Sequence, residues 1–420
     1  MYYILFTFFL ATGCFLINRI PFIKNAGLGT KTITLLFLLK VFAGLLVGWM
    51  SQKFYPQGND YWNLNTAGWN EYQLLINDPG YFFKDLFISH YQNGYDGFFH
   101  SVGTYWNDLK NTMIGKFLAC CNIFSRGNYY INSMIFNFLG FFGHIAFYRV
   151  FADVFKKQYW PVIIGCFLLP TTLYFSSGIH KDLVVFSMLG LFSYVLYFSL
   201  KNKLTTKYFL FACLSFFVLL FMRNFLAIAM VPATIGFIIS SRKKWNSLIV
   251  FSSVYFTGLA LLIIMQVIKP SYEPLKIITQ RQQDFLDLPD ASSQLKTIRL
   301  QPSLASFATN APLAIDHGLL RPYIWDTPTR FLIPLAVELL IYELLFILMI
   351  LLYRRNSFTD NYFVLWGLFV AFTMILFTGY IVPNTGSIVR YRSLYLPLIL
   401  TPVLCTINWD KLKTILRIRL

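Results

Sequence analysis

Apolar runs of membrane-spanning length recur along almost the whole chain, and they constrain its fold more than any other feature. The hydrocarbon core of a bilayer is about 30 Å thick, so a helix needs about 20 apolar residues to cross it. Runs of this kind predict about eleven spans. Their expected positions are 3–18, 32–50, 129–148, 159–177, 182–200, 206–221, 225–240, 247–268, 331–352, 361–381 and 393–408.

The composition supports the same class of fold. Hydrophobic residues make up 57% of the chain and charged residues only 13%, whereas soluble domains carry about 25% charged residues. In a soluble chain the net charge of +17 would suggest a nucleic-acid partner. Here most Lys and Arg stand in short connections between apolar runs, as in cytoplasmic loops. We expect an all-α polytopic membrane protein, one integral membrane domain over residues 1–420, and no nucleic acid.

Neither cysteines nor histidines signal a metal centre. The six cysteines include no CxxC pair, and the five histidines show no ligand spacing. We therefore expect no metal ligand set and no cofactor. A divalent cation at Asp60 is left open, without a second acid beside Asp60 to favour it.

Charge asymmetry predicts the orientation in the plasma membrane. One set of alternate connections is short and basic, for example the segment with Arg149, Lys156 and Lys157, and the positive-inside rule places it in the cytoplasm. The other set contains two long loops, 51–128 and 269–330, in which acids roughly offset bases. These loops are expected outside, with the N-terminus outside and the C-terminus in the cytoplasm.

The first long loop has the composition of ordered structure. It is rich in Trp, Tyr and Phe, the reverse of a disordered segment. Aromatic amphipathic segments beside spans usually lie in the membrane interface. We expect interfacial helices in both long loops, with membrane lipid as a partner. In the first loop the apolar segments are Tyr72–Ile76, Tyr81–Ile88 and Ile114–Cys121.

Asp60 is the first acid in the chain and the leading candidate for a catalytic residue. It follows the second predicted span, in the sequence Gly58-Asn59-Asp60, within an aromatic surround. A carboxylate in such a place suits general-base catalysis, and Asn59 beside it suits substrate binding. The alternative is a simple turn, which Gly, Asn and Asp also favour.

A second candidate stands where the fourth predicted span meets the fifth. His180, Lys181 and Asp182 follow Pro170 and Gly178, which interrupt the helix. An imidazole, a cation and a carboxylate would thus meet at the outer boundary, and Lys181 with the amides that open the next helix would hold a phosphate. The alternative is a helix cap by Asp182, with Lys181 reaching toward water.

Several outward helix ends carry arginines that could bind phosphate through the planar guanidinium. Arg223-Asn224 forms the tip of a short hairpin, and Arg390 and Arg392 enter the last span from outside, against the positive-inside trend. Arg321 stands near the end of the second loop. The alternatives are contact with lipid headgroups for Arg223 and pairing with acids of the outer loops for Arg390 and Arg392.

Ionisable residues also occur inside predicted spans. Lys40 and Glu343 stand near mid-depth, and Glu338 precedes Glu343 on the same span. Such residues are costly in lipid and are candidates for function. They would pair with one another for packing or relay protons.

The chain resembles the GT-C superfamily of membrane glycosyltransferases. The resemblance lies in the large loop after an early span with an acid near its start, and in the helix end Pro170…Phe175-Ser176-Ser-Gly178…Lys181-Asp182. The whole chain is also similar to multi-pass proteins found with bacterial surface-polysaccharide machinery. It differs from the family in having Asn59-Asp60 where paired acids are usual, and in placing them after the second span.

The resemblance implies a GT-C-like transferase that works outside the cytoplasmic membrane. It would move a sugar from a polyprenyl-phosphate-linked donor to a glycan or lipid acceptor, with Asp60 as the base. Two alternatives stay open. Arginines of the second loop also suit an O-antigen-type polysaccharide polymerase, and the intramembrane Lys40, Glu338 and Glu343 suit a transporter or flippase of lipid-linked glycans.

Overall fold

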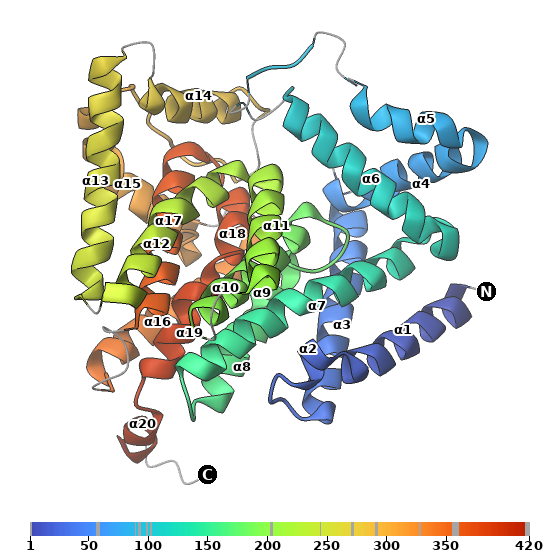
Figure 1. The fold of residues 1–420 in the computed structure, drawn as a ribbon, viewed down its shortest axis with the longest axis horizontal. Coiled ribbons are helices and arrows are strands. Elements are labelled where there is room, and N and C mark those ends of the chain that lie inside the picture. The colour runs from blue at the N-terminus through green and yellow to red at the C-terminus, as the bar shows by residue number, and fades with distance from the viewer. Residues whose placement is uncertain are drawn as a thin grey trace. The chain divides into compact units, whose positions relative to one another are not determined.

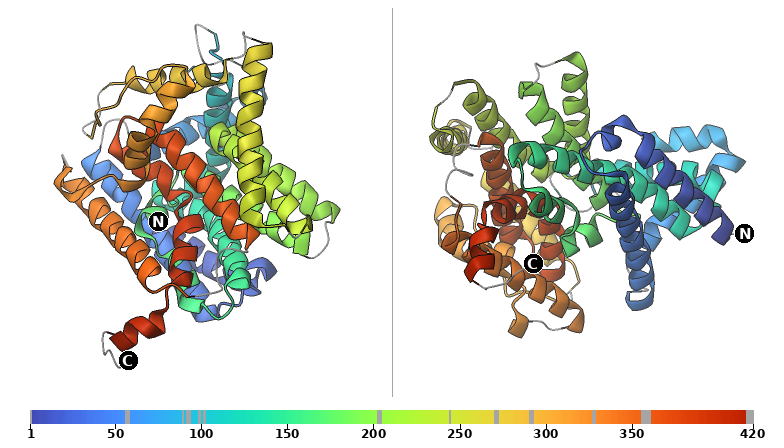
Figure 2. Two further views of the ribbon diagram at one scale, coloured as in Figure 1. Left: turned by 90° about the vertical axis from the view of Figure 1, so that its left-hand side faces the viewer. Right: turned by 90° about the horizontal axis from the view of Figure 1, so that it is seen from below.

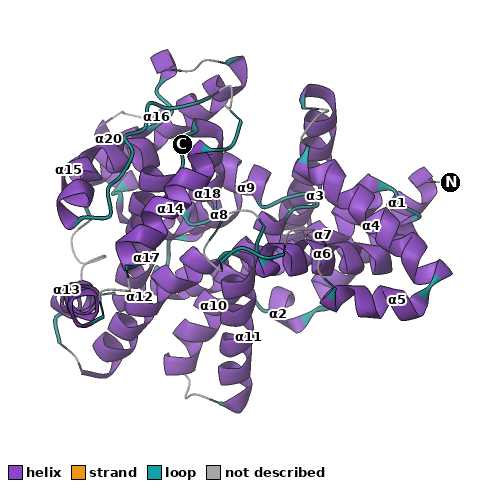
Figure 3. Ribbon diagram, turned by 90° about the horizontal axis from the view of Figure 1, so that it is seen from above, coloured by secondary structure: helices purple, strands orange, loops and turns teal. Residues whose placement is uncertain are grey.

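The fold is all-α throughout the part of the chain that the structure describes. This computed structural model describes residues 2–55, 59–88, 90, 94–97, 100, 103–201, 205–243, 245–269, 273–289, 293–326, 329–354 and 361–415. Over these ranges, helices are joined by loops and turns, with isolated bridges such as Gln294–Asn384 and no strand (Figure 3). The all-α prediction is confirmed.

Among the described residues, 8 helices are long and apolar enough to cross a membrane, and the bent pair α18–α19 would make a ninth span. The prediction of a multi-pass membrane protein is confirmed at this level, whereas the count of eleven and the orientation stay predictions. The 8 are α1 (Tyr2–Arg19), α3 (Thr30–Phe54), α7 (Tyr129–Val154), α10 (Lys181–Lys201), α12 (Asn224–Lys243), α13 (Ser247–Ile268), α16 (Ile333–Leu351, extended to Arg330 by a 3-10 turn) and α17 (Tyr362–Ile381).

Three predicted spans differ from the long helices. The segment 159–177 is two short helices, α8 (Tyr159–Phe167) and α9 (Pro170–Phe175), because Pro170 lacks the N–H that would continue the first helix. The segment 206–221 is α11 (Thr206–Met222), which has only 17 residues. The last predicted span, 393–408, contains α19 (Leu396–Thr406), which has only 11 residues and is bent by 66° against the preceding α18 (Thr385–Ser393).

The chain forms two compact units, which we describe separately (Figure 1). Unit 1 comprises Met1–Val150 and Thr172–Asn224, and unit 2 comprises Phe151–Thr171 and Phe225–Leu420. One integral domain therefore stays a prediction. Besides the helices above, unit 1 contains α2 (Pro21–Lys24), α4 (Asp60–Asn77), α5 (Pro79–Lys84), the 3-10 turn η1 (Asp85–Phe87) and α6 (Tyr105–Ser125). Unit 2 contains α14 (Pro274–Leu286), α15 (Leu304–Ile315) and α20 (Trp409–Ile415). It also contains the π-helical turn η2 (Asp316–Leu320) and the 3-10 turns η3 (Ile324–Asp326) and η4 (Arg330–Leu332).

Glycines let the apolar helices of unit 1 approach closely. A Cβ on Gly143 of α7 would lie 2.5 Å from the Cα of Ser187 on α10, and one on Gly190 would lie 2.5 Å from the Gly143 carbonyl oxygen. Small residues at such crossings are typical of membrane helices, which associate by close packing. From α10 the chain returns along α11, which lies beside it (Figure 2).

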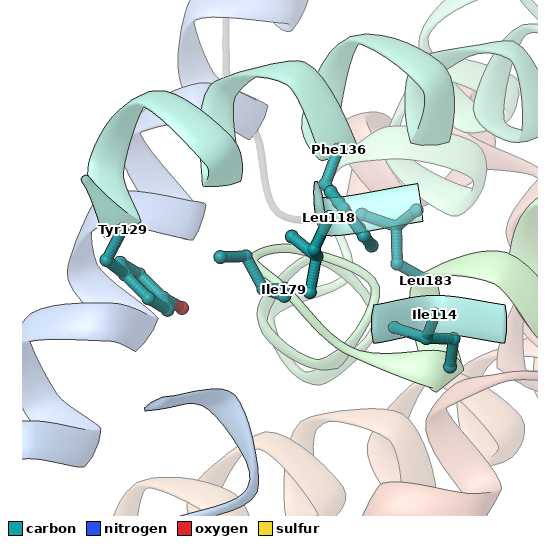
Figure 4. Packing of buried hydrophobic residues seen from close by; sticks show 6 residues of the cluster. All are labelled: Ile114, Leu118, Tyr129, Phe136, Ile179 and Leu183. Atoms are coloured by element: carbon teal, nitrogen blue, oxygen red, sulfur yellow. The ribbon is translucent and has the colours of Figure 1, made fainter. Parts of the chain in front are cut away.

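The helices of the first long loop pack on the membrane helices of unit 1 through a buried apolar cluster. Its side chains come from α6, α7, α10 and the turn before α10, and Figure 4 shows them lying close together. The turn that carries His180 is therefore built on the main core of this unit. The cluster consists of Ile114, Leu118, Tyr129, Phe136, Ile179 and Leu183.

The second long loop is held on unit 2 by a buried glutamine. Gln282 of α14 donates from Nε2 to the carbonyl oxygens of Ile298 and Tyr380, at 3.0 and 2.8 Å. Its Oε1 accepts from the backbone N–H of Leu300 at 2.8 Å. One side chain thus joins two parts of the loop to the end of α17.

A group of charged side chains, which we call the loop clamp, holds the first loop together. The loop clamp consists of Glu71, Asp85, His90, Asp108 and Lys116. The His90 ring nitrogens lie 2.8 Å from Asp108 and 3.0 Å from Asp85. Lys116 lies 2.9 Å from Glu71 and 3.4 Å from Asp85. Because both ring nitrogens face carboxylates, the geometry suits the doubly protonated imidazolium.

Replacing Gly143 by Ala should destabilise the protein by about 1–3 kcal/mol, because the new Cβ would meet the backbone of α10. The matched control is Gly258→Ala on α13, where a Cβ would have nothing within 4 Å. Graded denaturation in detergent measures both variants. Equal stability of the Gly143 and Gly258 variants would contradict the close crossing of α7 and α10.

The loop clamp should loosen as the pH rises. Burial lowers the pKa of His90, but hydrogen bonds to Asp85 and Asp108 and their charges raise it overall above its ordinary 6.5. Because the pKa of His90 is higher in the folded protein, protonated His90 stabilises the fold fully below pH 6.5. This stabilisation is lost as the pH rises through the folded-state pKa. Protease cleavage of the first loop in nanodiscs should increase from about pH 6 to about pH 9. The His90→Gln variant, assayed at each pH to correct for the protease itself, should show no such change.

Candidate functional site

The candidate site lies in unit 1, where the turn between α9 and α10 meets the start of α4. The turn contains Gly178, whose φ of +80° is a conformation that glycine adopts without strain. A Cβ at this position would also lie 3.1 Å from the Tyr129 hydroxyl. Gly58, which we expected in the loop before Asp60, lies outside the described residues.

The first turn of α4 is fixed on both sides. Asn59 caps the helix, because its side-chain oxygen accepts from the N–H groups of Tyr61 and Trp62 at 3.1 and 3.4 Å. The Trp62 indole donates to the Gly48 carbonyl at 2.9 Å and stacks on Tyr129 with ring centroids 4.4 Å apart. The backbone that carries Asp60 is thus attached to α3 and α7.

Asp60 faces the turn from this position. Its Oδ2 lies 3.5 Å from His180 Nε2, and the Tyr61 ring lies 5.0 Å from the imidazole. The Asp60 side chain is 54% exposed, whereas that of His180 is only 1% exposed. A carboxylate open to solvent therefore touches an imidazole that is buried.

A buried ion pair stands behind the imidazole. His180 Nδ1 lies 3.2 Å from Asp182 Oδ2, and Arg223 Nη2 donates to Asp182 Oδ1 at 2.5 Å. Asp182 is 0% exposed and Arg223 is 13% exposed at the side chain. We call Asp60, His180, Asp182 and Arg223 the polar row.

His180 Nδ1 has two partners, both from Asp182. The backbone N–H of Asp182 donates to Nδ1 at 3.1 Å, and the carboxylate Oδ2 lies 3.2 Å from the same nitrogen. The other ring nitrogen, Nε2, faces Asp60 Oδ2 at 3.5 Å. The imidazole is therefore held between Asp182 and Asp60.

The polar row is suited to proton transfer at its exposed end. Asp60 can accept a proton from a substrate hydroxyl, and His180, fixed by Asp182, holds the carboxylate in place. Arg223 offsets the charge of Asp182, which would otherwise be costly in this apolar setting. The arrangement thus provides one accessible base with buried support.

No protein-family model, curated protein or solved structure matches the chain. Within the described residues, no group of three or more His, Cys, Asp or Glu side chains is placed to hold a metal ion. The site must therefore be interpreted from its own geometry.

The structure brings together most of the site residues predicted in unit 1, although with other partners. Asn59 serves as a helix cap, and Asp182 pairs with Arg223. The backbone N–H of Asp182 bonds the His180 ring and that of Leu183 bonds the His180 carbonyl, so these two amides are already used. Lys181 begins α10 and Asn224 begins α12, both partly buried. Lys181 stays a predicted phosphate ligand at the start of α10.

Arg321, a predicted substrate ligand in unit 2, belongs to a local ion cluster. Its Nε lies 2.8 Å from Asp316, and its Nη1 contacts Asp326. The Tyr323 hydroxyl donates to Asp316 at 2.6 Å. Burial raises the pKa of Asp316, but the hydrogen bonds from Tyr323 and Arg321 lower it below its ordinary value. Arg321 is thus paired with Asp316 and Asp326, and its role as a substrate ligand stays a prediction.

Arg390 and Arg392 lie on α18 in unit 2. Arg392 is buried, and its Nη1 donates to the carbonyls of Leu319 and Arg321 at 2.9 and 3.0 Å. It therefore joins α18 to the end of η2. Arg390 is partly buried, and its carbonyl accepts from the Ser393 hydroxyl at 2.7 Å.

The sequence predicts Lys40 as a candidate in unit 1 but not its partners, which form a second polar group there. Lys40 of α3 is 1% exposed, and its ammonium lies 2.6 Å from the Ser176 carbonyl and 3.1 Å from His144 Nε2 on α7. The sequence feature that indicates this contact is His144, a histidine within the apolar run 129–148. In unit 2, Glu338 accepts from the Thr171 N–H at 3.0 Å and from the Tyr342 hydroxyl. Lys40 and Glu338 thus each have partners within their own unit.

Breaking the buried ion pair should be costly. Asp182→Ala should destabilise the protein by about 3–5 kcal/mol, because it leaves the Arg223 guanidinium without its carboxylate. The double variant Asp182→Ala, Arg223→Leu should lose less than the sum of the two single losses. A double-mutant cycle by graded denaturation measures this coupling. Simple addition of the two losses would show that the pair does not interact.

Proposed function

We propose that the protein is a membrane glycosyltransferase. It moves a sugar from a polyprenyl-phosphate-linked donor to a glycan or lipid acceptor on the extracytoplasmic side of the plasma membrane. Asp60 is the general base. The observation that carries the proposal is the polar row, in which an exposed carboxylate at the start of α4 is held by a buried imidazole and ion pair.

The place of Asp60 supports a lipid-linked substrate. Asp60 begins α4 six residues beyond Phe54, the last residue of the membrane-length helix α3. A group at this depth can meet both a headgroup and water. Polyprenyl-phosphate sugars present their reacting carbon at the same boundary, with the apolar chain in lipid. Soluble acceptors would approach Asp60 from the exposed side.

The chemistry is a single displacement with inversion. The acceptor oxygen attacks the anomeric carbon of the donor while Asp60 takes the hydroxyl proton, and the bond from that carbon to the phosphate oxygen breaks. The polyprenyl phosphate leaves with the bonding electron pair. His180 contacts Asp60 at 3.5 Å from a buried position, so its role is to position the base.

Lys181 is the residue of unit 1 that best suits the leaving phosphate. It follows His180 directly in the chain and opens the 21-residue helix α10, so an ammonium and the positive helix end stand together. One well-placed donor of this kind is worth about 3–4 kcal/mol in the transition state. The roles predicted for Arg390 and Arg392 from the sequence stay predictions.

A transporter of lipid-linked glycans is the second candidate, and Lys40 favours it. An ammonium that is 1% exposed within a membrane-length helix, beside His144, is typical of sites that bind or release protons. Movement of a fluorescent lipid-linked glycan across proteoliposomes without covalent change would support this candidate. An O-antigen-type polysaccharide polymerase, the other alternative, would instead give products that form a ladder of repeats.

Asp60→Asn should lower sugar transfer by about 10²–10⁴-fold, because the amide cannot take the proton. The assay uses proteoliposomes, a panel of radiolabelled polyprenyl-phosphate hexoses and a glycolipid acceptor mixture. Asp78→Asn is the matched control, since Asp78 is an exposed acid at the other end of α4 and an amide still caps α5.

Two outcomes separate the roles in the polar row. Full transfer by the Asp60 variant would exclude Asp60 as the base. His180→Gln should lower the rate less than Asp60→Asn and should shift its pH profile, because His180 acts through Asp60. Equal losses in both variants, with unchanged pH profiles, would show that the row is only structural.

A further inference from the structure

The tip of the first loop buries a charged side chain and exposes apolar ones, the reverse of a helix on a soluble protein. The tip consists of α5, η1 and Ile88, that is Pro79–Ile88. Asp85 points inward and is only 5% exposed. Large apolar side chains of the same ten residues point outward. This arrangement is independent of the polar row and of the proposed transferase.

The outward side of the tip is apolar and aromatic. Phe87 is 77% exposed, Phe83 is 67% exposed, and Tyr81 and Ile88 are 43% and 42% exposed. Lys84 is the charged residue that is exposed among them. Contiguous apolar patches of this kind are rare on surfaces that face water and mark a site of interaction.

The inward side is held by charges. Lys116 donates to the Phe82 carbonyl at 2.5 Å and contacts Asp85 at 3.4 Å. His90 contacts Asp85 at 3.0 Å. The groups that face His90 and Lys116 are Asp85, Asp108 and Glu71, and the Tyr95 hydroxyl donates to Asp108 at 2.9 Å. The loop clamp therefore fixes the orientation that keeps Phe83 and Phe87 outward.

The exposed apolar surface of this loop continues onto a membrane-length helix. Phe117 and Phe124, seven residues apart on α6, are 41% and 60% exposed. The Phe124 ring lies 6.4 Å from Phe9 of α1, a candidate span that is only 11% buried within the protein. At its other end, α6 contacts α11 through Trp106 and Phe221, with ring centroids 6.1 Å apart. The exposed candidate span α1 is thus adjacent to a helix of the first loop.

We propose that the tip inserts into the interface of the lipid bilayer on the side of the first loop. Phe83, Phe87 and Ile88 enter the boundary between headgroups and acyl chains, where aromatic side chains are favoured. Tyr81 keeps its hydroxyl toward water, and Lys84 extends to the lipid phosphates. The tip is then a second attachment of the first loop, besides the ends of α3 and α7. Anchoring at this point holds the end of α4, at Asn77, close to the membrane surface.

Site-directed spin labelling tests the proposal in the full-length protein. A variant without its six cysteines receives single cysteines at Phe83, Phe87 or, as the matched control, Asn77 of α4, which is exposed and polar. The protein is reconstituted in vesicles of neutral and anionic phospholipid. Collision rates with oxygen, which concentrates in lipid, and with a water-soluble nickel complex are then measured for each label.

The expected result is an oxygen-to-nickel ratio at Phe83 and Phe87 at least about threefold higher than at Asn77, because oxygen and the nickel complex partition oppositely across the interface. Equal ratios at the three sites would overturn the proposal. Protection from both reagents, or dipolar broadening between labels of neighbouring copies, would overturn it in favour of a protein partner or a second copy. A monodisperse, labelled protein shows that each variant has folded, since these side chains are exposed.

Discussion

The buried contact between Asp182 and Arg223 is the interaction on which the candidate site depends. Asp182 is completely buried at the start of an apolar helix, where an unpaired carboxylate would be costly. Its two oxygens face Arg223 and His180, and its own N–H bonds the His180 ring. The position of the imidazole, and through it that of Asp60, follows from the need to satisfy this single acid.

The turn between α9 and α10 is held by a cation near each end. Lys40 binds the Ser176 carbonyl at 2.6 Å, and Arg223 binds Asp182 at 2.5 Å. Irregular backbone within membrane helices must find its hydrogen-bond partners inside the protein. Because the two cations come from α3 and from the end of α11, the turn is fixed by helices that are far apart in sequence. Such preorganisation is what a positioned base requires.

Much of this arrangement follows from the sequence, and the remainder depends on tertiary contacts. Hydropathy predicts most membrane-length helices, because burial in lipid requires continuous apolar runs. It cannot show whether a run is one helix, and Pro170 divides the segment 159–177. Likewise, His180, Lys181 and Asp182 could be selected as polar residues at a helix boundary. The hydrogen bonds that set their roles depend on the placement of α4 and α11.

The contact of Asp182 with Arg223 could nevertheless have been derived. The two helices α10 and α11 have 21 and 17 residues. Two consecutive helices of similar length that return through a short connection bring the start of the first close to the end of the second. The residue after α11 must then lie near the start of α10, where Asp182 is. By contrast, the position of Lys40 beside His144 depends on the register of α3 against α7, which composition does not determine.

The partners of the charged residues also decide which of them can serve a substrate phosphate. Arg223 is paired with a buried carboxylate, and Arg321 is paired with Asp316 and Asp326, so the charge of each is already offset. The Nη1 group of Arg392 is bound by backbone carbonyls, which fix its orientation. Lys181 stands beside His180 at the start of the 21-residue helix α10. A base and a phosphate ligand must share one substrate, so the neighbour of His180 is the cation whose place best fits the chemistry.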